Sequence, residues 1–272
     1  MSLLRDIDMT DLPIGVFDSG VGGLSVVKEI KNILPQENIV YFGDTARIPY
    51  GNKSIDTINN YTNETVDFLL RKKVKAIVIA CNTISAVAKD TVLNKAKGIP
   101  VIDVISSCSI DIANKFNNIA IIATNATIKS KAYENYIHKL NPKVEIFTTA
   151  CPLLVPMIEE GFLDHLALDL IVEHYLNYFK FKPIECLILG CTHYPFIINS
   201  IAKYIDKKVL IYNPSIITAL NLKNILEKNN CLNTFDKESD KYYVTDNIER
   251  FYQIASTLIN NINFNDVNLI NF

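Results

Sequence analysis

Short runs of apolar, mostly β-branched residues recur along this chain, and segments with helical periodicity lie between them. Most of the runs are continuously apolar, as in strands of a parallel sheet that is covered on both faces. The alternation of such strands with helices predicts an α/β fold built on parallel sheets. We expect strands at residues 14–17, 39–42, 76–80, 101–105, 119–123, 144–148, 186–189 and 209–212.

Two of the intervening segments carry clear helix signals. Apolar residues between 24 and 34 recur on one helical face, and the pattern stops at Pro35, which cannot continue a helix. Ser54 precedes a second periodic segment, and its hydroxyl is suited to cap a helix that runs to about Arg71.

One strand pattern occurs twice. Residues 76–83 read AIVIACNT and residues 187–193 read LILGCTH, so each has a buried strand, a small residue, a cysteine and two polar residues. Each cysteine is therefore expected at the end of a strand, just before a helix. Ligands of open α/β sheets bind at the carboxyl ends of the strands. Two facing halves would then hold Cys81 and Cys191 across one cleft.

The repeat predicts two similar, doubly wound, flavodoxin-like domains with the active site between them. No linker rich in Pro, Gly or Ser separates the two copies. We expect the first domain to comprise residues 1–102 together with a returning segment, 214–272. The second domain is expected to comprise residues 103–213.

Two facing cysteines suit inversion of configuration at a carbon atom. A thiol at a helix N-terminus lies near unpaired N–H groups and the positive end of the helix dipole, which lower its pKa. The same donors bind a carboxylate, and Asn82, Thr83 and Thr192 add side-chain donors. One cysteine can remove an α-proton while the other delivers a proton to the opposite face. The pattern favours an amino-acid racemase; the competing interpretation is that each cysteine is a small core residue.

Each cysteine has a candidate partner for its proton. Asp18 ends the first expected strand, and in a parallel sheet it would lie at the same edge as Cys81. His193 follows Cys191 by two residues and can reach over the cleft. The alternative for the Asp-Ser-Gly sequence at 18–20 is a turn or cap, which these residues also favour.

The overall composition narrows the class of function. A formal net charge of −2 gives no electrostatic reason for binding nucleic acid or an anionic membrane surface. No apolar run approaches the length of a membrane span, and the first residues are too acidic for a signal peptide, so a cytoplasmic location is expected. The six cysteines show no metal-binding spacing, so we expect free thiols in a reducing compartment.

Five sequence blocks, taken in order, resemble the bacterial glutamate racemases of the aspartate/glutamate racemase family. The resemblance runs over roughly residues 14–220 and implies two α/β domains related by pseudo-twofold symmetry. It also implies interconversion of L- and D-glutamate, supplying D-glutamate for peptidoglycan, with no pyridoxal phosphate or other cofactor, no metal, and commonly a homodimer. The blocks are VFDSGVGGL at 16–24, YFGDTARIPYG at 41–51, ACNT at 80–83, ACPLLVP at 150–156 and LGCTHYP at 189–195.

The same resemblance implies how the catalytic work is divided. Cys81 would be the base that acts on D-glutamate, and Cys191 the base that acts on L-glutamate. Asp18 would assist Cys81, and His193 would assist Cys191.

Further site positions follow from the resemblance. In IEEG at 158–161, Glu159 matches the family's additional catalytic acid, with the adjacent Glu160 as the competing choice. The segment ATNATI at 123–128 differs from the family's usual Gly-Thr-x-x-Thr-Ile block but keeps its second threonine. The positions that match substrate contacts are Ser19, Tyr50, Gly51, Asn82, Thr83, Thr127 and Thr192.

Three other functions are the alternatives. An aspartate racemase would use the same pair of cysteines on a shorter side chain. A nicotinamide-dependent oxidoreductase would use Gly20 and Gly22 after a strand and Asp44 on a ribose, but Ser25 replaces the third glycine and the paired cysteines would have no role. A non-catalytic inhibitor of another cellular machine, a second role reported among glutamate racemases, has no added tail or basic patch to support it.

Overall fold

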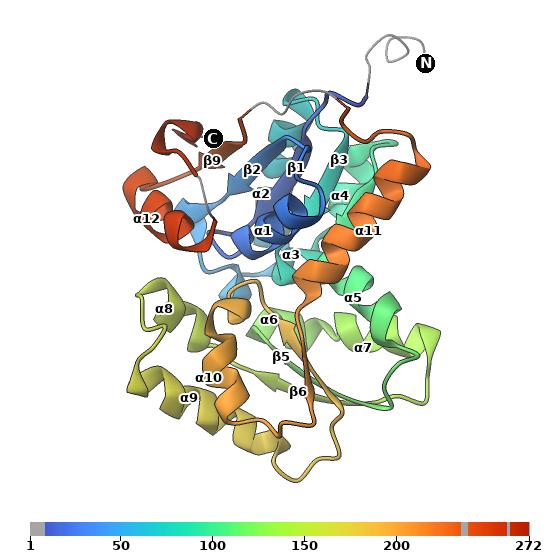
Figure 1. Ribbon diagram of the computed structural model, residues 1–272, viewed down its shortest axis with the longest axis vertical. Helices are drawn as coiled ribbons and strands as arrows, with labels where there is room; N and C mark the ends of the chain where they lie inside the picture. The colour runs from blue at the N-terminus through green and yellow to red at the C-terminus, as the bar shows by residue number, and fades with distance from the viewer. Residues whose placement is uncertain (1–8, 235–238, 260–261, 272) are drawn as a thin grey trace.

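The computed structural model describes residues 9–234, 239–259 and 262–271, and within them two sheets lie one above the other (Figure 1). The larger sheet has six strands in the order β10-β9-β2-β1-β3-β4, and the smaller has four in the order β6-β5-β7-β8. All the strand pairs described are parallel, which confirms the predicted α/β class. The six-stranded sheet comprises β1 (Ile14–Asp18), β2 (Ile39–Gly43), β3 (Ala76–Ile79), β4 (Val101–Asp103), β9 (Lys241–Val244) and β10 (Val267–Leu269); the four-stranded sheet comprises β5 (Asn118–Ala123), β6 (Glu145–Ala150), β7 (Cys186–Gly190) and β8 (Leu210–Tyr212).

All eight predicted strands are present, with ends that differ by a residue or two. The prediction that the fourth strand reaches residue 105 is wrong at its end. Its last residue is Asp103, whose carboxylate accepts hydrogen bonds from the N–H groups of Ile105 and Ser106 and so begins a helix there. Strands β9 and β10 were not predicted, because each is only three or four residues long and partly polar.

Helices cover both faces of the six-stranded sheet, because its strands carry apolar side chains on both sides. Val16 packs into the core on one face, with α1, α11 and α12, and Phe17 into the core on the other, with α2 and α4. The predicted cap is confirmed, since Ser54 Oγ accepts a hydrogen bond from the Thr57 N–H. The helices of this six-stranded half are α1 (Leu24–Ile33), α2 (Ile55–Arg71), α3 (Asn82–Val87), α4 (Lys89–Ala96), α11 (Pro214–Lys228) and α12 (Ile248–Leu258).

The four-stranded sheet is covered in the same way. Ile121 faces α5 and α7, whereas Ile122 faces α8, α9 and α10. The helices of this four-stranded half are α5 (Val104–Ile112), α6 (Asn125–Ser130), α7 (Ala132–Leu140), α8 (Leu154–Glu159), α9 (Leu166–Leu176) and α10 (Ile198–Lys203). Short 3₁₀ turns complete the described chain at η1 (Thr45–Arg47), η2 (Tyr50–Asn52), η3 (Asn177–Phe179), η4 (Tyr194–Ile197) and η5 (Phe264–Asp266).

A single hydrophobic core runs through the junction of the two halves. Cys108 on α5 and Leu222 on α11 belong to the same buried cluster as Val78 on β3 and Ile188 on β7. Figure 1 shows α3, α5 and α6 at the level of this junction. The carboxyl ends of both sheets are thereby directed toward the same region. The domain boundaries at 102/103 and 213/214 stay a prediction.

Candidate active site

Cys81 lies at the carboxyl end of the six-stranded sheet, two residues after the last residue of β3. It is the N-cap of α3, and its carbonyl accepts a hydrogen bond from the Ser85 N–H at 2.9 Å. The side chain is 5% exposed, and its thiol donates to Ser19 Oγ across 3.6 Å. Asn82 and Thr83 occupy the first two positions of α3, so three consecutive polar groups lie at this strand end.

The predicted lowering of the Cys81 pKa is wrong. Burial, the largest cause, and the charge of Asp18 raise the pKa of Cys81 to about 12, against the lowering by the Ile84 N–H and the Ser19 hydroxyl. The helix behind the thiol has only six residues, so its dipole is a weak counterweight to desolvation. Cys81 therefore carries its proton at neutral pH.

Asp18 lies behind Ser19 and connects the two halves. One carboxylate oxygen accepts from the Gly20 N–H at 3.0 Å, and the other accepts from the Thr192 hydroxyl of the four-stranded half at 3.4 Å. Burial raises the pKa of Asp18, and the nearby His193 lowers it. The carboxylate acts on Cys81 through its charge.

Cys191 follows β7, but no α-helix begins there, which corrects the predicted strand–cysteine–helix order. A turn covers residues 191–193, the 3₁₀ turn η4 follows with Pro195 in its first turn, and α10 begins only at Ile198. The donor facing this thiol is instead a side chain. Nδ1 of His193 lies 3.7 Å from Cys191 Sγ.

His193 connects Cys191 to a carboxylate. Its Nε2 lies 3.0 Å from Glu159 Oε1. Burial lowers the pKa of His193, but the hydrogen bonds and charges of Cys191 and Glu159 outweigh it and raise that pKa to about 10. The imidazole is therefore protonated at neutral pH. Of the two adjacent carboxylates, Glu159 reaches the site, whereas Glu160 is paired with Arg250 at 2.8 Å.

A cavity of about 60 Å³ lies between the two strand ends, and both thiols line it. Asp18 lies behind the residues that line this cavity. Ten of the twelve predicted site residues line the cavity: Ser19, Tyr50, Gly51, Cys81, Asn82, Thr83, Glu159, Cys191, Thr192 and His193.

Thr127 also lies behind the residues that line the cavity, whereas Thr124 is one of the lining residues. The Thr127 hydroxyl is 3.0 Å from Thr124 Oγ1, which in turn is 3.1 Å from the Thr83 hydroxyl across the junction. Thr124 was not predicted as a site residue, although it caps α6 directly after a predicted strand, which is a signal that the sequence carries. The other lining residues without a predicted role are Ile48, Pro49, Asn52, Asn125, Cys151, Pro152, Val155 and Pro156.

Several lining residues are held by partners outside the cavity. Tyr50 donates its hydroxyl to Asp44, which also accepts from Arg47 Nε at 2.6 Å. Asn82 Oδ1 accepts from the Tyr133 hydroxyl at 2.7 Å, so its amide nitrogen is the group left to serve the cavity.

The described residues show neither a metal-binding cluster nor a membrane-spanning helix. That part of the chain contains no group of three or more His, Cys, Asp or Glu side chains arranged to hold a metal ion. It also contains no helix with both the length and the apolar character needed to cross a bilayer.

Comparison with known proteins gives concordant matches. The family model for Asp/Glu/hydantoin racemases matches residues 14–220. The glutamate racemase of Neisseria meningitidis serogroup C is 45% identical over 250 residues, which cover 91% of this chain and 92% of the relative. That of Chlorobaculum tepidum is 40% identical over 264 residues, covering 96% and 97%. The crystal structure of glutamate racemase from Francisella tularensis in complex with D-glutamate is 46% identical, covers 96% of this chain and 98% of its own, and superposes with a TM-score of 0.92.

Proposed function

This chain belongs to the Asp/Glu/hydantoin racemase family, and on that premise we propose that Cys81 and Cys191 interconvert L- and D-glutamate by a two-base mechanism. The enzyme is a glutamate racemase, an amino-acid isomerase whose product serves peptidoglycan synthesis. The single observation that carries the two-base proposal is that both thiols line one cavity from opposite sheets.

From L-glutamate, the Cys191 thiolate takes the α-proton, and the C–H electron pair stays on the substrate. The Cys81 thiol then donates its proton to the opposite face of the α-carbon and becomes the thiolate. The enzyme is left with the proton on Cys191, the form that acts on D-glutamate. The raised pKa of Cys81 and the imidazolium of His193 beside Cys191 support the starting distribution of protons.

The helper residues follow the same division. Asp18 assists Cys81 through its charge. His193, which is hydrogen-bonded to Glu159, assists proton transfer at Cys191. The carbanion needs donors on the substrate carboxylate, where negative charge accumulates. We assign that role to the hydroxyl and amide groups at the strand ends, with Thr127 acting through Thr124. The substrate-binding set is Ser19, Tyr50, Gly51, Asn82, Thr83, Thr127 and Thr192.

The alternative substrate is aspartate, because a two-thiol site does not by itself select side-chain length. The test is circular dichroism of L-glutamate and L-aspartate solutions incubated with the enzyme, with the Cys81→Ser variant as the control. We expect the signal of L-glutamate alone to decay to zero. Decay of L-aspartate alone would assign the runner-up function, and no decay of either would overturn the proposal.

Cofactor independence, assembly and location complete the proposal. We expect full activity after exhaustive dialysis against EDTA and no pyridoxal absorbance; a need for added metal or pyridoxal phosphate would contradict this. The six cysteines are all free thiols in the structure, which supports a reducing, cytoplasmic location. A homodimer is proposed from the family resemblance, and sedimentation equilibrium would test it.

A further inference from the structure

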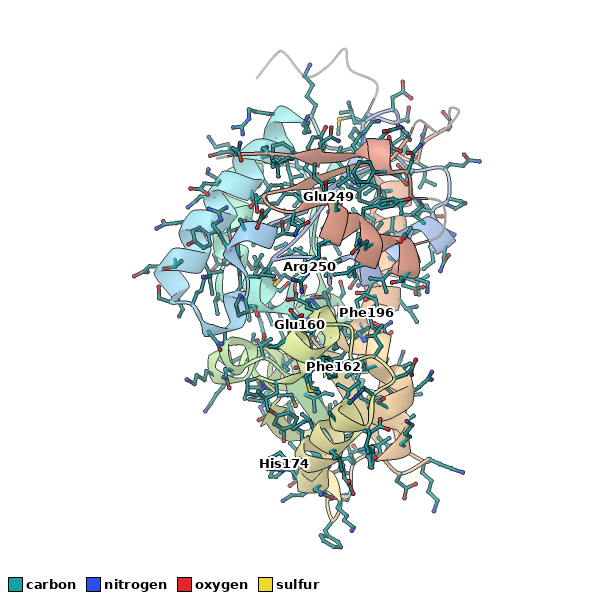
Figure 2. The ribbon with its side chains drawn as sticks, turned by 90° about the vertical axis from the view of Figure 1, so that its left-hand side faces the viewer. Glu160, Phe162, His174, Phe196, Glu249 and Arg250 are labelled. Atoms are coloured by element: carbon teal, nitrogen blue, oxygen red, sulfur yellow. The ribbon has the colours of Figure 1, made fainter. Side chains whose placement is uncertain are left out.

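An ion pair crosses the junction of the two halves beside the active site. Arg250, on α12 of the six-stranded half, lies 2.8 Å from Glu160 Oε1, at the end of α8 in the four-stranded half. Figure 2 shows the two residues next to each other at the level where the halves meet. The side chains are 50% and 65% exposed, so the pair adds little to stability. Its position, next to Glu159, suggests a role other than stability.

Arg250 is fixed on the six-stranded side. Asn247 caps α12 by accepting from the Arg250 N–H at 2.9 Å. The adjacent Phe251 is buried, and its ring stacks on Tyr41 with centroids 6.0 Å apart. Tyr41 in turn donates to the Gly20 carbonyl at 2.7 Å, in the loop that follows Asp18. The start of α12, from which the guanidinium extends, is therefore anchored to the six-stranded half.

On the other side, Arg250 meets the end of a short helix. Besides the ion pair, its Nη2 donates to the main-chain carbonyl of Glu159 at 3.1 Å. That carbonyl belongs to the last turn of α8. The main-chain carbonyls of a last turn have no N–H group from a following turn to accept from. Because α8 has only six residues, its own hydrogen bonds hold this end weakly.

These contacts form a continuous path to one thiol. Arg250 holds the main chain of Glu159, Glu159 Oε1 lies 3.0 Å from His193 Nε2, and His193 Nδ1 lies 3.7 Å from Cys191. We propose that Arg250 is a positioning residue of the six-stranded half that holds Glu159 on His193 and so tunes Cys191, the thiol of the opposite half. This inference rests on the proposed function.

The first test compares Arg250→Ala with Arg250→Lys and with Lys203→Ala. The last is a control, because Lys203 is as exposed as Arg250 and its ion pair, to Asp169 at 2.8 Å, lies away from the site. We expect Arg250→Ala to lower kcat/KM about three- to ten-fold, with an unchanged melting temperature. Lysine at 250 keeps a donor and should recover part of the loss, and Lys203→Ala should have no effect. Equal activity of Arg250→Ala and wild type would overturn the inference.

The second test asks whether Arg250 acts through Glu159. In a double-mutant cycle, Arg250→Ala should add no further loss in the Glu159→Gln background, because the path is already broken. The same fold-loss in both backgrounds would show an independent route and overturn the inference.

The third test separates the ion pair from the carbonyl contact. Exchanging the two charges, by Arg250→Glu with Glu160→Arg, restores the pair but leaves no donor at 250 for the Glu159 carbonyl. We expect the exchanged variant to keep wild-type stability and the low kcat/KM of Arg250→Ala; full recovery of rate would contradict a positioning role. Wild-type enzyme inactive on both glutamate enantiomers would instead refute the proposed function itself, so the two failures are distinguishable.

Discussion

The two thiols occupy corresponding positions at the ends of β3 and β7, yet their surroundings carry opposite charges. Burial and the negative charge of Asp18 raise the pKa of Cys81 to about 12. Cys191 faces His193, whose pKa is raised to about 10 and which is therefore a cation at neutral pH. A two-base racemase needs one thiol and one thiolate at the start of each turnover. The repeated strand end places two thiols at one cavity, and the groups next to them differ in charge.

The two sides also differ in where their support comes from. Asp18 and Ser19 belong to the same sheet edge as Cys81. Cys191 depends on Glu159 from α8, and Glu159 is held by Arg250 from the opposite half. The Cys191 side is therefore sensitive to how the halves are docked, whereas the Cys81 side is largely assembled within its own sheet.

The largest effect is expected from removing either thiol. Cys81→Ser and Cys191→Ser should each lower racemisation in both directions by roughly 10²–10⁴ or more, because each enantiomer needs one cysteine as base and the other as acid. Polarimetry of both enantiomers measures the loss, and Cys231→Ser, away from the cavity, is the control. Full activity in either catalytic variant would refute the two-base model. Exchange of the α-proton with solvent, without inversion, would support it.

The next effect is a pH dependence of the free energy of unfolding, which arises from His193 on the Cys191 side. The pKa of His193 rises from 6.5 to about 10 on folding, so protonation favours the folded state. This stabilisation is complete below pH 6.5 and is lost as the pH rises toward 10. We expect wild type to lose on the order of 2–4 kcal/mol more over this range than His193→Asn. Urea unfolding at both ends of the range measures the difference. The exposed His174→Asn should behave as wild type, and identical pH profiles for His193→Asn and wild type would contradict the assignment.

The sequence predicts those features of the fold and the site that are set by local residue patterns. Continuous apolar runs predicted the strands, and the repeated strand–cysteine arrangement predicted that Cys81 and Cys191 share one cleft. Each inference starts from short stretches of residues that are neighbours in the chain.

The remaining features depend on docking and burial. The pKa of Cys81 moves opposite to the prediction because desolvation, which no local pattern reports, exceeds the effect of a six-residue helix. The contact of Thr124 with Thr83 forms only because the two halves dock, and Arg250 reaches Glu159 only because the C-terminal segment returns across the junction. Such contacts join residues that are distant in sequence and carry no periodicity.

A smaller loss of rate is expected from a side chain that is added on the six-stranded half and pushes against His193 on the Cys191 side. A Cβ added at Gly22, in the loop after β1, would meet the Thr192 hydroxyl and lie 2.5 Å from His193 Nδ1. Gly22→Ala should therefore displace His193 and lower kcat/KM roughly ten- to a hundred-fold. Gly98→Ala is the control, because that glycine has φ +95° but no atom within 4 Å of an added Cβ. It should cost about 1 kcal/mol of stability without loss of rate. Steady-state kinetics at matched folded fraction compare the two, and an active Gly22→Ala would show that the junction tolerates movement.

The smallest effect, and the sharpest test of the division of labour, is an asymmetry in isotope effects. L- and D-glutamate have equal free energies, so any variant must change kcat/KM equally in both directions. A difference between the helpers must therefore appear in kcat, in KM, or in the isotope effect of α-deuterated substrate, and the isotope effect is the quantity to measure. Asp18→Asn should raise that effect mainly from D-glutamate, because removal of the deuteron by Cys81 becomes slower. His193→Asn should raise it mainly from L-glutamate, where Cys191 is the base.

The structure adds a reason to expect this asymmetry to be incomplete. Asp18 accepts a hydrogen bond from Thr192, next to Cys191, and its own pKa responds to His193. Asp18→Asn should therefore produce a small secondary rise from L-glutamate, which Thr192→Val should reproduce without the larger effect from D-glutamate. Competitive isotope measurements on both enantiomers resolve the two contributions. Equal effects from both enantiomers in both helper variants would break the pairing of Asp18 with Cys81 and of His193 with Cys191, while the two-thiol mechanism would stand.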